Sequence, residues 1–253
     1  MMKQREDKTQ MVFGIRAIME AIESGKEIEK LMIQNGLRGG LYHDFFQLVK
    51  YHNIPFNNVP LQGLDRITRK NHQGVIAYLS PITYQNIENL VPMLYEDGKN
   101  PFLLVLDRIT DVRNFGAIAR TAECSGVNAI IIPSRGAATI NEDAIKTSAG
   151  ALHKIEVCRE ENLKITLEFL KNSGIKIYGI SEKAAEYYYD VDFTGPVALM
   201  LGSEENGISE AYMKYLDGFI KIPMVGQIES LNVSVAGGIT MFEVTKQRLN
   251  APE

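Results

Sequence analysis

The sequence is poor in the residues that bind metals or form disulfides, with only two cysteines and four histidines. Cys124 and Cys158 are well separated and make no metal-binding framework. We therefore expect both to be buried as small hydrophobic residues in a reducing compartment. The histidines, at positions 43, 52, 72 and 153, show no HExxH or other ligand spacing. The sequence thus predicts no structural or catalytic metal.

Long apolar stretches are also lacking. No run approaches the roughly 20 apolar residues that a helix needs to cross a bilayer, and the polar start, MMKQREDKTQ, has no apolar signal core. There is no Ser/Pro/Gln-rich tract, and hydrophobic residues make up 45% of the chain, which is typical of a folded protein. We expect a cytoplasmic protein with no membrane partner.

Positive charge is scarce, since the net charge is -4. Taken alone this argues against binding nucleic acid, because phosphates attract Lys and Arg. The distribution is uneven, however: residues 1–79 hold 11 Lys and Arg against 8 Asp and Glu, a net of +3, and the remainder has a net of -7. This asymmetry points to an RNA-handling part at the N-terminus.

The hydrophobic pattern predicts a small α/β domain over residues 1–80. An amphipathic helix is expected from Gly14, in GIRAIMEAIES. A strand is expected from Ile28, in IEKLMIQ, and a buried strand from Gly74, in GVIAYL. Residues 81–100 have a weaker pattern with two prolines. They are the best candidate for a linker, with a helix packed on either domain as the alternative.

From residue 101 to 253 the chain alternates between short apolar runs and helical patterns. Five of the apolar runs are typical of buried strands: FLLVLD, NAIIIP, IKIYGI, PVALMLG and GFIKIP. They predict an α/β fold with an open, mostly parallel sheet, in which ligands bind beyond the carboxyl ends of the strands. No GxGxxG follows the first of these strands, which argues against a nucleotide-dependent oxidoreductase.

Three segments at predicted strand ends contain candidate site residues. In the first, Asn114 is a possible helix cap, and Gly116 lies one turn before Arg120, so that another backbone or a ligand could approach that arginine. In the second, Gly202 permits close contact with a ligand and Glu204 brings a carboxylate; an ordinary strand–turn–helix junction is the alternative. The third contains Ser230, Leu231 and Asn232 at a helix start, where Ser and Asn are good caps.

Together the three segments resemble the motifs of the SpoU (TrmH-like) RNA ribose 2′-O-methyltransferases. The matches are NxGxIxRTA at Asn114–Ala122, LGSExxGI at Leu201–Ile208 and IPMxGxxxSLNVSVA at Ile222–Ala236, and the run TSAGA from Thr147 also fits. The resemblance implies a SPOUT-type fold whose C-terminal part is threaded into a deep trefoil knot. It also implies a homodimer with the knot at the interface and with both subunits building the site.

The resemblance further implies S-adenosylmethionine as cofactor, contacted by Gly202, Ile222 and Leu231. The matching residues of the active centre are Asn114, Arg120, Glu204, Ser230 and Asn232. The family proposal makes the equivalent of Arg120 the general base. An arginine rarely gives up its proton, so a guanidinium that grips a phosphate and stabilises the developing alkoxide is an equal alternative.

The N-terminal segment resembles the RNA-binding domain of the two-domain members of the family. Within them, GIRAIMEAI and RKNHQGVIA, at Arg69–Ala77, are most similar to members that methylate a guanosine in the peptidyl-transferase P loop of 23S rRNA. Compact relatives that modify tRNA usually lack this domain, so rRNA is favoured over tRNA. A non-catalytic RNA-binding protein is a third interpretation. The candidate RNA contacts are Arg66, Arg69, Lys70 and His72, with a solvated loop as the alternative.

Overall fold

The computed structural model describes residues 10–251 and divides into two compact units. The first comprises residues up to 83 together with 139–142, and the second comprises 84–138 and the chain from 143 onward. The first expected domain begins in residues 1–9 and the last one ends in residues 252–253, and both of these stretches lie outside the described residues. Each unit has its own hydrophobic core.

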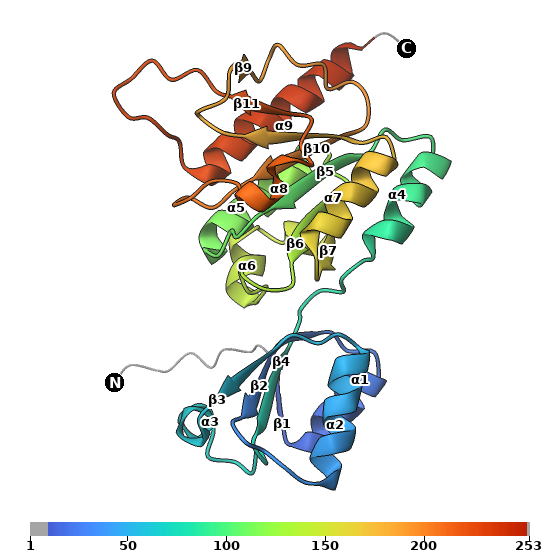
Figure 1. Ribbon diagram of the computed structural model, residues 1–253, viewed down its shortest axis with the longest axis vertical. Coiled ribbons are helices and arrows are strands. Elements are labelled where there is room, and N and C mark those ends of the chain that lie inside the picture. The colour runs from blue at the N-terminus through green and yellow to red at the C-terminus, as the bar shows by residue number, and fades with distance from the viewer. Residues whose placement is uncertain (1–9, 252–253) are drawn as a thin grey trace. The chain divides into compact units, whose positions relative to one another are not determined.

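The N-terminal unit is a four-stranded sheet in the order β1-β4-β2-β3. The central strand β4 pairs antiparallel with β1 and β2, and β3 pairs parallel with β2. Helices α1 and α2 pack on one face and α3 on the other (Figure 1). The helix expected from Gly14 is confirmed, with Ile15, Ile18 and Ile22 buried. The bounds are β1 (Met11–Phe13), α1 (Ile15–Glu23), β2 (Ile28–Gln34), α2 (Gly40–Tyr51), β3 (Phe56–Val59), α3 (Leu61–Ile67) and β4 (Val75–Leu79).

Residues 81–100 were expected to be either a linker or a helix packed on one of the domains. They contain helix α4 (Ile87–Glu96). Asn86 caps it by accepting a hydrogen bond from the backbone N–H of Asn89. Ile87, Val91 and Leu94 lie in the core of the second unit. These residues therefore belong to the larger unit rather than to a free connection.

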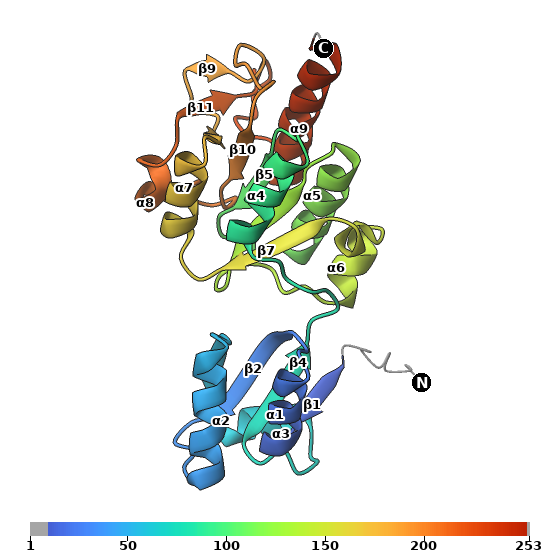
Figure 2. The same cartoon turned by 90° about the vertical axis from the view of Figure 1, so that its right-hand side faces the viewer.

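The second unit is a seven-stranded, entirely parallel sheet in the order β7-β6-β5-β10-β8-β11-β9. Helices α4 and α7 share a core with one face of the sheet, while α5 and α9 pack together (Figure 2). The bounds are β5 (Phe102–Leu106), α5 (Val112–Cys124), β6 (Ala129–Pro133), α6 (Glu142–Thr147), β7 (Glu156–Glu160), α7 (Leu163–Asn172), β8 (Lys176–Ile180), β9 (Glu186–Tyr187), β10 (Val197–Leu201), α8 (Glu210–Met213), β11 (Gly218–Lys221) and α9 (Val233–Asn250).

The α/β fold and the mostly parallel sheet are confirmed, and all five apolar runs form strands. Two further strands, β7 and β9, had no continuous apolar signal because both lie at edges of the sheet. Strand β10 inserts between β5 and β8 although other strands separate it from β5 in sequence. The carboxyl ends of β5, β10, β8 and β11 consequently meet at one edge. The trefoil knot stays a prediction.

The two cysteines differ in their surroundings. Cys158, on β7, is buried as expected, and burial raises the pKa of its thiol to about 12. Cys124 is exposed, so the expectation for it was wrong. It is the last residue of α5, whose core-facing residues include Ile118, Ala119 and Ala122. No helix in the described part of the chain is long and apolar enough to span a membrane.

Arg248 anchors the C-terminal end of helix α9 through hydrogen bonds. The guanidinium donates hydrogen bonds to the backbone carbonyls of Phe193 and Gly195, and of Asn100 and Pro101, at 2.7–3.2 Å. Burial lowers the pKa of Arg248. One side chain thus joins the C-terminal helix to the segments that lead into β5 and β10.

Replacing Arg248 by methionine should therefore destabilise the second unit. The four carbonyls lose a charged donor, and a hydrogen bond to a charged group contributes about 1.5–3 kcal/mol net, although removing the guanidinium also removes the cost of burying its charge. We expect the free energy of unfolding to fall by roughly 2–3 kcal/mol in urea titrations. Lys164→Met, at an exposed position of α7, is the control. Equal stability of the two variants would contradict this role.

Candidate active site

Asn114 lies in the first turn of α5 with its side chain directed out of the helix. The helix begins at Val112 because Asp111 is its cap: the Asp111 carboxylate accepts hydrogen bonds from the backbone N–H groups of Arg113 and Asn114. The interpretation of Asn114 as the helix cap is therefore wrong. Its amide group is left to bond to residues from other segments.

A tight turn follows β10 and contains Glu204. Ser203 and Gly207 exchange backbone hydrogen bonds of 3.1 and 2.8 Å, and Gly207 has a φ of 62°, which favours glycine. Gly202 is buried beneath this turn, and a Cβ atom there would overlap the backbone of Gly207 and Ile208. Glycine at 202 thus makes room for the protein's own backbone, so the expectation that it chiefly makes room for a ligand is corrected.

Asn232 caps α9 and faces Asn114 at the same time. Its Oδ1 accepts a hydrogen bond from the backbone N–H of Ser234 at 2.9 Å, which confirms the expected cap. Its Nδ2 is then free to donate away from the helix. One side chain therefore serves both the helix start and the site.

Asn114, Glu204 and Asn232 form a closed triangle of hydrogen bonds. Both asparagines donate to Glu204 Oε1, at 2.7 Å from Asn114 and 3.0 Å from Asn232, and Asn232 also donates to Asn114 Oδ1 at 3.0 Å. The three residues come from the three segments singled out in the sequence. The carboxylate orients both amides, because an ionised carboxylate only accepts hydrogen bonds.

The triangle borders a pocket of about 770 Å³ at the carboxyl ends of β8, β10 and β11. This volume lies within the range of small-molecule sites. Apolar side chains and backbone form much of its wall, and Glu182, Lys183 and Glu229 add charge. Six of the predicted site residues line it: Gly202, Glu204, Ile222, Ser230, Leu231 and Asn232.

Asn114 and Arg120 are the two predicted catalytic residues that do not line the pocket. Asn114 reaches its border through the hydrogen-bond triangle, but in the described part of the chain no such link exists for Arg120. It is exposed on α5, is not among the residues that line the pocket, and makes no hydrogen bond or ion pair within residues 10–251. Ser230 lines the pocket but is exposed on the irregular segment between β11 and α9. A guanidinium without an internal partner is available to a group outside this chain.

Gly116 explains how α5 approaches the run that begins at Thr147. A Cβ atom at position 116 would lie 2.6 Å from the Thr147 Cβ and 3.1 Å from the backbone nitrogen of Ser148. The glycine thus admits a neighbouring backbone at position 116 itself, while the expected close approach to Arg120 stays a prediction. The backbone belongs to the TSAGA run, which packs against the helix of the first motif.

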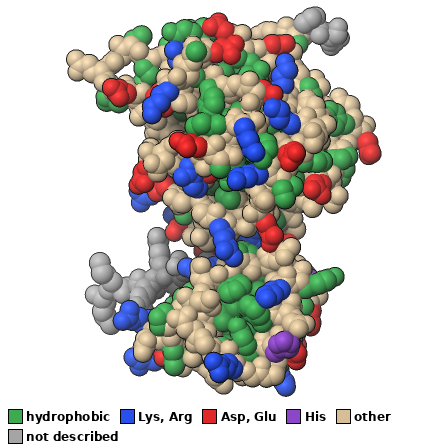
Figure 3. Space-filling model, viewed as in Figure 1, with side chains coloured by type: hydrophobic (Ala, Val, Ile, Leu, Met, Phe, Trp, Pro, Cys, Tyr) green, Lys and Arg blue, Asp and Glu red, His purple; other side chains and the backbone are tan. Residues whose placement is uncertain are grey.

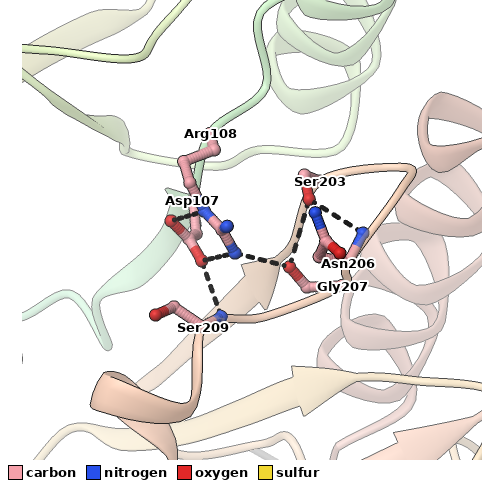
Figure 4. Close-up of polar contacts among 6 residues, drawn as sticks. All are labelled: Asp107, Arg108, Ser203, Asn206, Gly207 and Ser209. Atoms are coloured by element: carbon pink, nitrogen blue, oxygen red, sulfur yellow. Dashed lines mark hydrogen bonds and ion pairs between the residues drawn. The ribbon is translucent and has the colours of Figure 1, made fainter.

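Asp107 and Arg108 fasten the Glu204 turn, and sequence reasoning missed both. Asp107 is buried directly after β5, and its carboxylate accepts hydrogen bonds from the Ser209 backbone N–H at 2.8 Å and from two guanidinium nitrogens of Arg108 at 3.0 Å. Arg108 also donates to the Gly207 carbonyl at 3.1 Å. Figure 4 shows the guanidinium between the aspartate and the turn.

The backbone conformation of Arg108 is strained, and the contacts of its side chain offset the free-energy cost of that strain. Its φ of 58° is rare for a residue other than glycine and costs on the order of 1 kcal/mol. The hydrogen bond to the Asp107 carboxylate raises the pKa of Arg108, as expected for a cation that donates to an acidic partner. A charged residue directly after a fully apolar strand was the sequence signal that could have identified this pair.

The predicted RNA contacts lie in the N-terminal unit and do not share one environment. Arg66, Arg69 and Lys70 are exposed, and the Lys70 ammonium lies 5.7 Å from the centre of the Phe13 ring. His72 is buried, and its two ring nitrogens contact Asp65 at 3.0 Å and the Gly74 backbone N–H at 3.1 Å. His72 therefore holds the loop together, and we leave it out of the proposed RNA contacts.

The charged side chains are dispersed on the face that Figure 3 shows, where Lys and Arg gather in no single patch on either unit. Within the described residues, no group of three or more His, Cys, Asp or Glu side chains is arranged to hold a metal ion. The pocket combines amides, carboxylates and hydroxyls with backbone, apolar side chains and the ammonium of Lys183.

Comparison with known proteins assigns a family to both units. The family model of the SpoU rRNA Methylase family matches residues 101–242, and that of the RNA 2′-O ribose methyltransferase substrate binding domain matches residues 11–85.

Two similar proteins carry the name of TrmH family tRNA/rRNA methyltransferases. The one from Staphylococcus saprophyticus is 36% identical over 238 residues, which cover 94% of this chain and 96% of that protein. YacO from Bacillus subtilis is 35% identical over 237 residues, or 94% and 95% of the two chains. The crystal structure of the SpoU methyltransferase AviRb from Streptomyces viridochromogenes in complex with AdoMet has a similar fold, with a TM-score of 0.61, 22% identity and coverage of 95% and 91%.

Replacing Arg108 by methionine should loosen the Glu204 turn. The Gly207 carbonyl loses one of its donors and keeps the Ser203 backbone N–H, and Asp107 loses its charged partner, while the strained backbone at 108 stays. We expect amide hydrogen exchange in residues 203–209 to quicken by roughly tenfold, the equivalent of one lost hydrogen bond. Arg113→Met, an exposed arginine on α5, is the control. Unchanged exchange in this turn would show that Arg108 does not hold it.

Proposed function

Because the chain belongs to the SpoU rRNA methylase family, we propose that it transfers a methyl group from S-adenosylmethionine to a ribose 2′-hydroxyl of RNA. The observation that carries this proposal is the hydrogen-bond triangle of Asn114, Glu204 and Asn232 beside the pocket. Three distant segments converge there on one set of polar groups. A purely structural role would not require them to border a cavity.

The pocket fits the cofactor in size and in chemistry. Apolar side chains such as Ile208, Phe219 and Ile222 suit an adenine ring, and the carboxylates of Glu182 and Glu229 suit hydroxyl and cationic groups. Gly202, Ile222 and Leu231 would hold it largely through backbone. When bound, S-adenosylmethionine supplies a methyl group that already carries its leaving group.

The protein must place the ribose hydroxyl and help to remove its proton, because an alcohol is a weak nucleophile. Glu204 fixes Asn114 and Asn232, and Asn232 and Ser230 would then orient the ribose. Arg120 acts either as the base or as a cation that grips the neighbouring phosphate and stabilises the developing alkoxide.

We further propose that the active centre is completed across a homodimer. Arg120 lies outside the pocket of its own chain, so a second copy would have to supply it. Val235, Phe242 and Leu249, spaced by seven residues, are exposed along α9, as are Val225 and Ile228 before it. Such a stripe on a helix is typical of a subunit interface. Val244, in contrast, is buried within the chain.

The favoured substrate is a guanosine of 23S rRNA in the cytoplasm. The first unit matches a substrate-binding family, and compact tRNA-modifying members usually lack such a domain. Because the names of the similar proteins include both tRNA and rRNA, tRNA is the alternative. Mass spectrometry of rRNA and tRNA from a strain that lacks the protein decides between them: loss of one 2′-O-methylguanosine in 23S rRNA supports the proposal, and intact rRNA with an altered tRNA overturns it.

Catalysis should require Arg120 and Asn232, whereas cofactor binding should not require Arg120. Each change to alanine should lower the methylation rate at least ~100-fold, the scale seen when a transition-state donor is removed. Calorimetry with S-adenosylhomocysteine should show wild-type affinity for Arg120→Ala. Arg120→Lys separates the two mechanisms: activity that rises as the lysine loses its proton supports the base, and inactivity at every pH supports the phosphate grip.

Mixing the two inactive variants tests whether the site spans two subunits. If Arg120 acts on the neighbouring chain, each mixed dimer has one site with both residues intact, so an equal mixture should regain about one quarter of wild-type activity. If Arg120 acts within its own chain, the mixture stays inactive. Light scattering that shows a fully active monomer would exclude the dimer altogether.

The N-terminal unit should supply the attraction for RNA. Reversing Arg66, Arg69 and Lys70 to glutamate should weaken binding of a 23S rRNA fragment that contains the P loop and flatten its salt dependence. Affinity for S-adenosylhomocysteine should not change. Lys26→Glu, Lys30→Glu and Arg38→Glu, at three other exposed positions of the same unit, together make the same change in net charge and are the control. If the control weakens binding equally, general charge rather than this loop attracts the RNA.

A further inference from the structure

Three consecutive tyrosines form an aromatic cluster at the edge of the parallel sheet. Tyr187 ends β9, and its ring stacks on that of Tyr189, with centroids 5.3 Å apart and planes inclined by 10°. Tyr188 meets Tyr189 edge-on at 5.0 Å. The Lys221 ammonium lies 4.9 Å from the centre of the Tyr187 ring. The rings are thus already ordered into a stack with a cation.

The two stacked rings face solvent instead of the core. Tyr187 is 36% and Tyr189 46% exposed, whereas the nearby Ala184, Val191 and Phe193 are buried. The core at this edge of the sheet is therefore filled without the two rings. Flat aromatic surface left in water is available to a ligand with a flat ring of its own.

The cluster adjoins the rim of the pocket. β9 pairs with β11 in a register that sets Tyr187 opposite Lys221, and the Tyr188 backbone N–H donates to the Lys221 carbonyl at 3.0 Å. Ile222, the next residue, lines the pocket, as does the segment Ser181–Lys183 that leads into β9. Both strands that hold the cluster therefore continue from residues of the pocket wall.

The charges around the cluster favour contact with a base over contact with a phosphate. Lys221 is the cation at the rings, and Lys183 lies on the segment before β9. Glu182, Glu186 and Asp190 bring negative charge on the same segment. A phosphate would meet repulsion here, whereas a neutral base stacks on aromatic rings whatever its sequence.

We propose that the tyrosine cluster, Tyr187 to Tyr189, stacks an unpaired base of the RNA substrate beside the nucleotide whose ribose is methylated. This inference rests on the proposed function of the pocket and adds a contact that holds the strand on the catalytic unit. A stacked neighbour stops the strand from sliding, so the target ribose is held at the pocket.

The test compares Tyr189→Leu with Tyr189→Phe in the full chain. The probe is the 23S rRNA P-loop fragment with 2-aminopurine in place of an unpaired base beside the target guanosine. Wild type and Tyr189→Phe should quench its fluorescence by stacking, and Tyr189→Leu should not. We expect Tyr189→Leu to weaken RNA binding roughly tenfold and to raise KM for RNA with little change in kcat. Ile165→Ala, an exposed apolar residue on α7, is the control.

Two further measurements keep the interpretation clear. S-adenosylhomocysteine affinity and the sedimentation coefficient should be unchanged in Tyr189→Leu. A shift of Tyr189→Leu toward monomers would show that the cluster is a contact between copies of the chain. An equal loss of RNA binding in Tyr189→Phe would show that the hydroxyl, not the ring, makes the contact. Either result overturns the proposal, as does wild-type RNA binding by Tyr189→Leu. If the wild-type protein itself neither binds nor methylates the fragment, it is the proposed rRNA function that fails.

Discussion

The site depends on the parallel pairing of β10 with both β5 and β8. Because parallel strands end at the same edge, this insertion brings together residues that follow β5, β10 and β11, although Asn114 and Asn232 are 118 positions apart in sequence. The Glu204 carboxylate then joins them through its hydrogen bonds to Asn114 and Asn232. Without that pairing the three motifs would be three unrelated turns.

Much of this could be predicted from the sequence, and the limits are physical. The five buried strands were evident because helices cover both faces of the sheet and make the strands continuously apolar. Strand order is set by long-range pairing, so the neighbours of β10 carried no local signal. The cap at Asp111 was missed because Asn114, three residues later, is an equally good capping residue. The roles of Asp107 and Arg108 depend on the returning turn at Gly207, which periodicity does not reveal.

Gly202 and Arg120 show that the role of a site residue cannot be predicted from its residue type alone. Gly202 looked like space for a ligand, yet the backbone of its own turn fills that space. Arg120 looked like part of the pocket, yet it lies outside it. The three motifs of this chain thus mix residues that shape the pocket with residues outside its wall. Sequence similarity alone gives both kinds the same weight.

Helix α9 is held at both ends by side chains that contact different edges of the same sheet. Asn232 anchors its start at the triangle, and Arg248 anchors its last turn at the carbonyls that precede β5 and β10. The residues from 233 to 247, all within the 18-residue helix α9, fix the distance between these two anchors. Inserting or deleting one residue would shift the far anchor by about 1.5 Å and turn it by about 100°. The length of this helix is therefore as constrained as the identity of the residues at its ends.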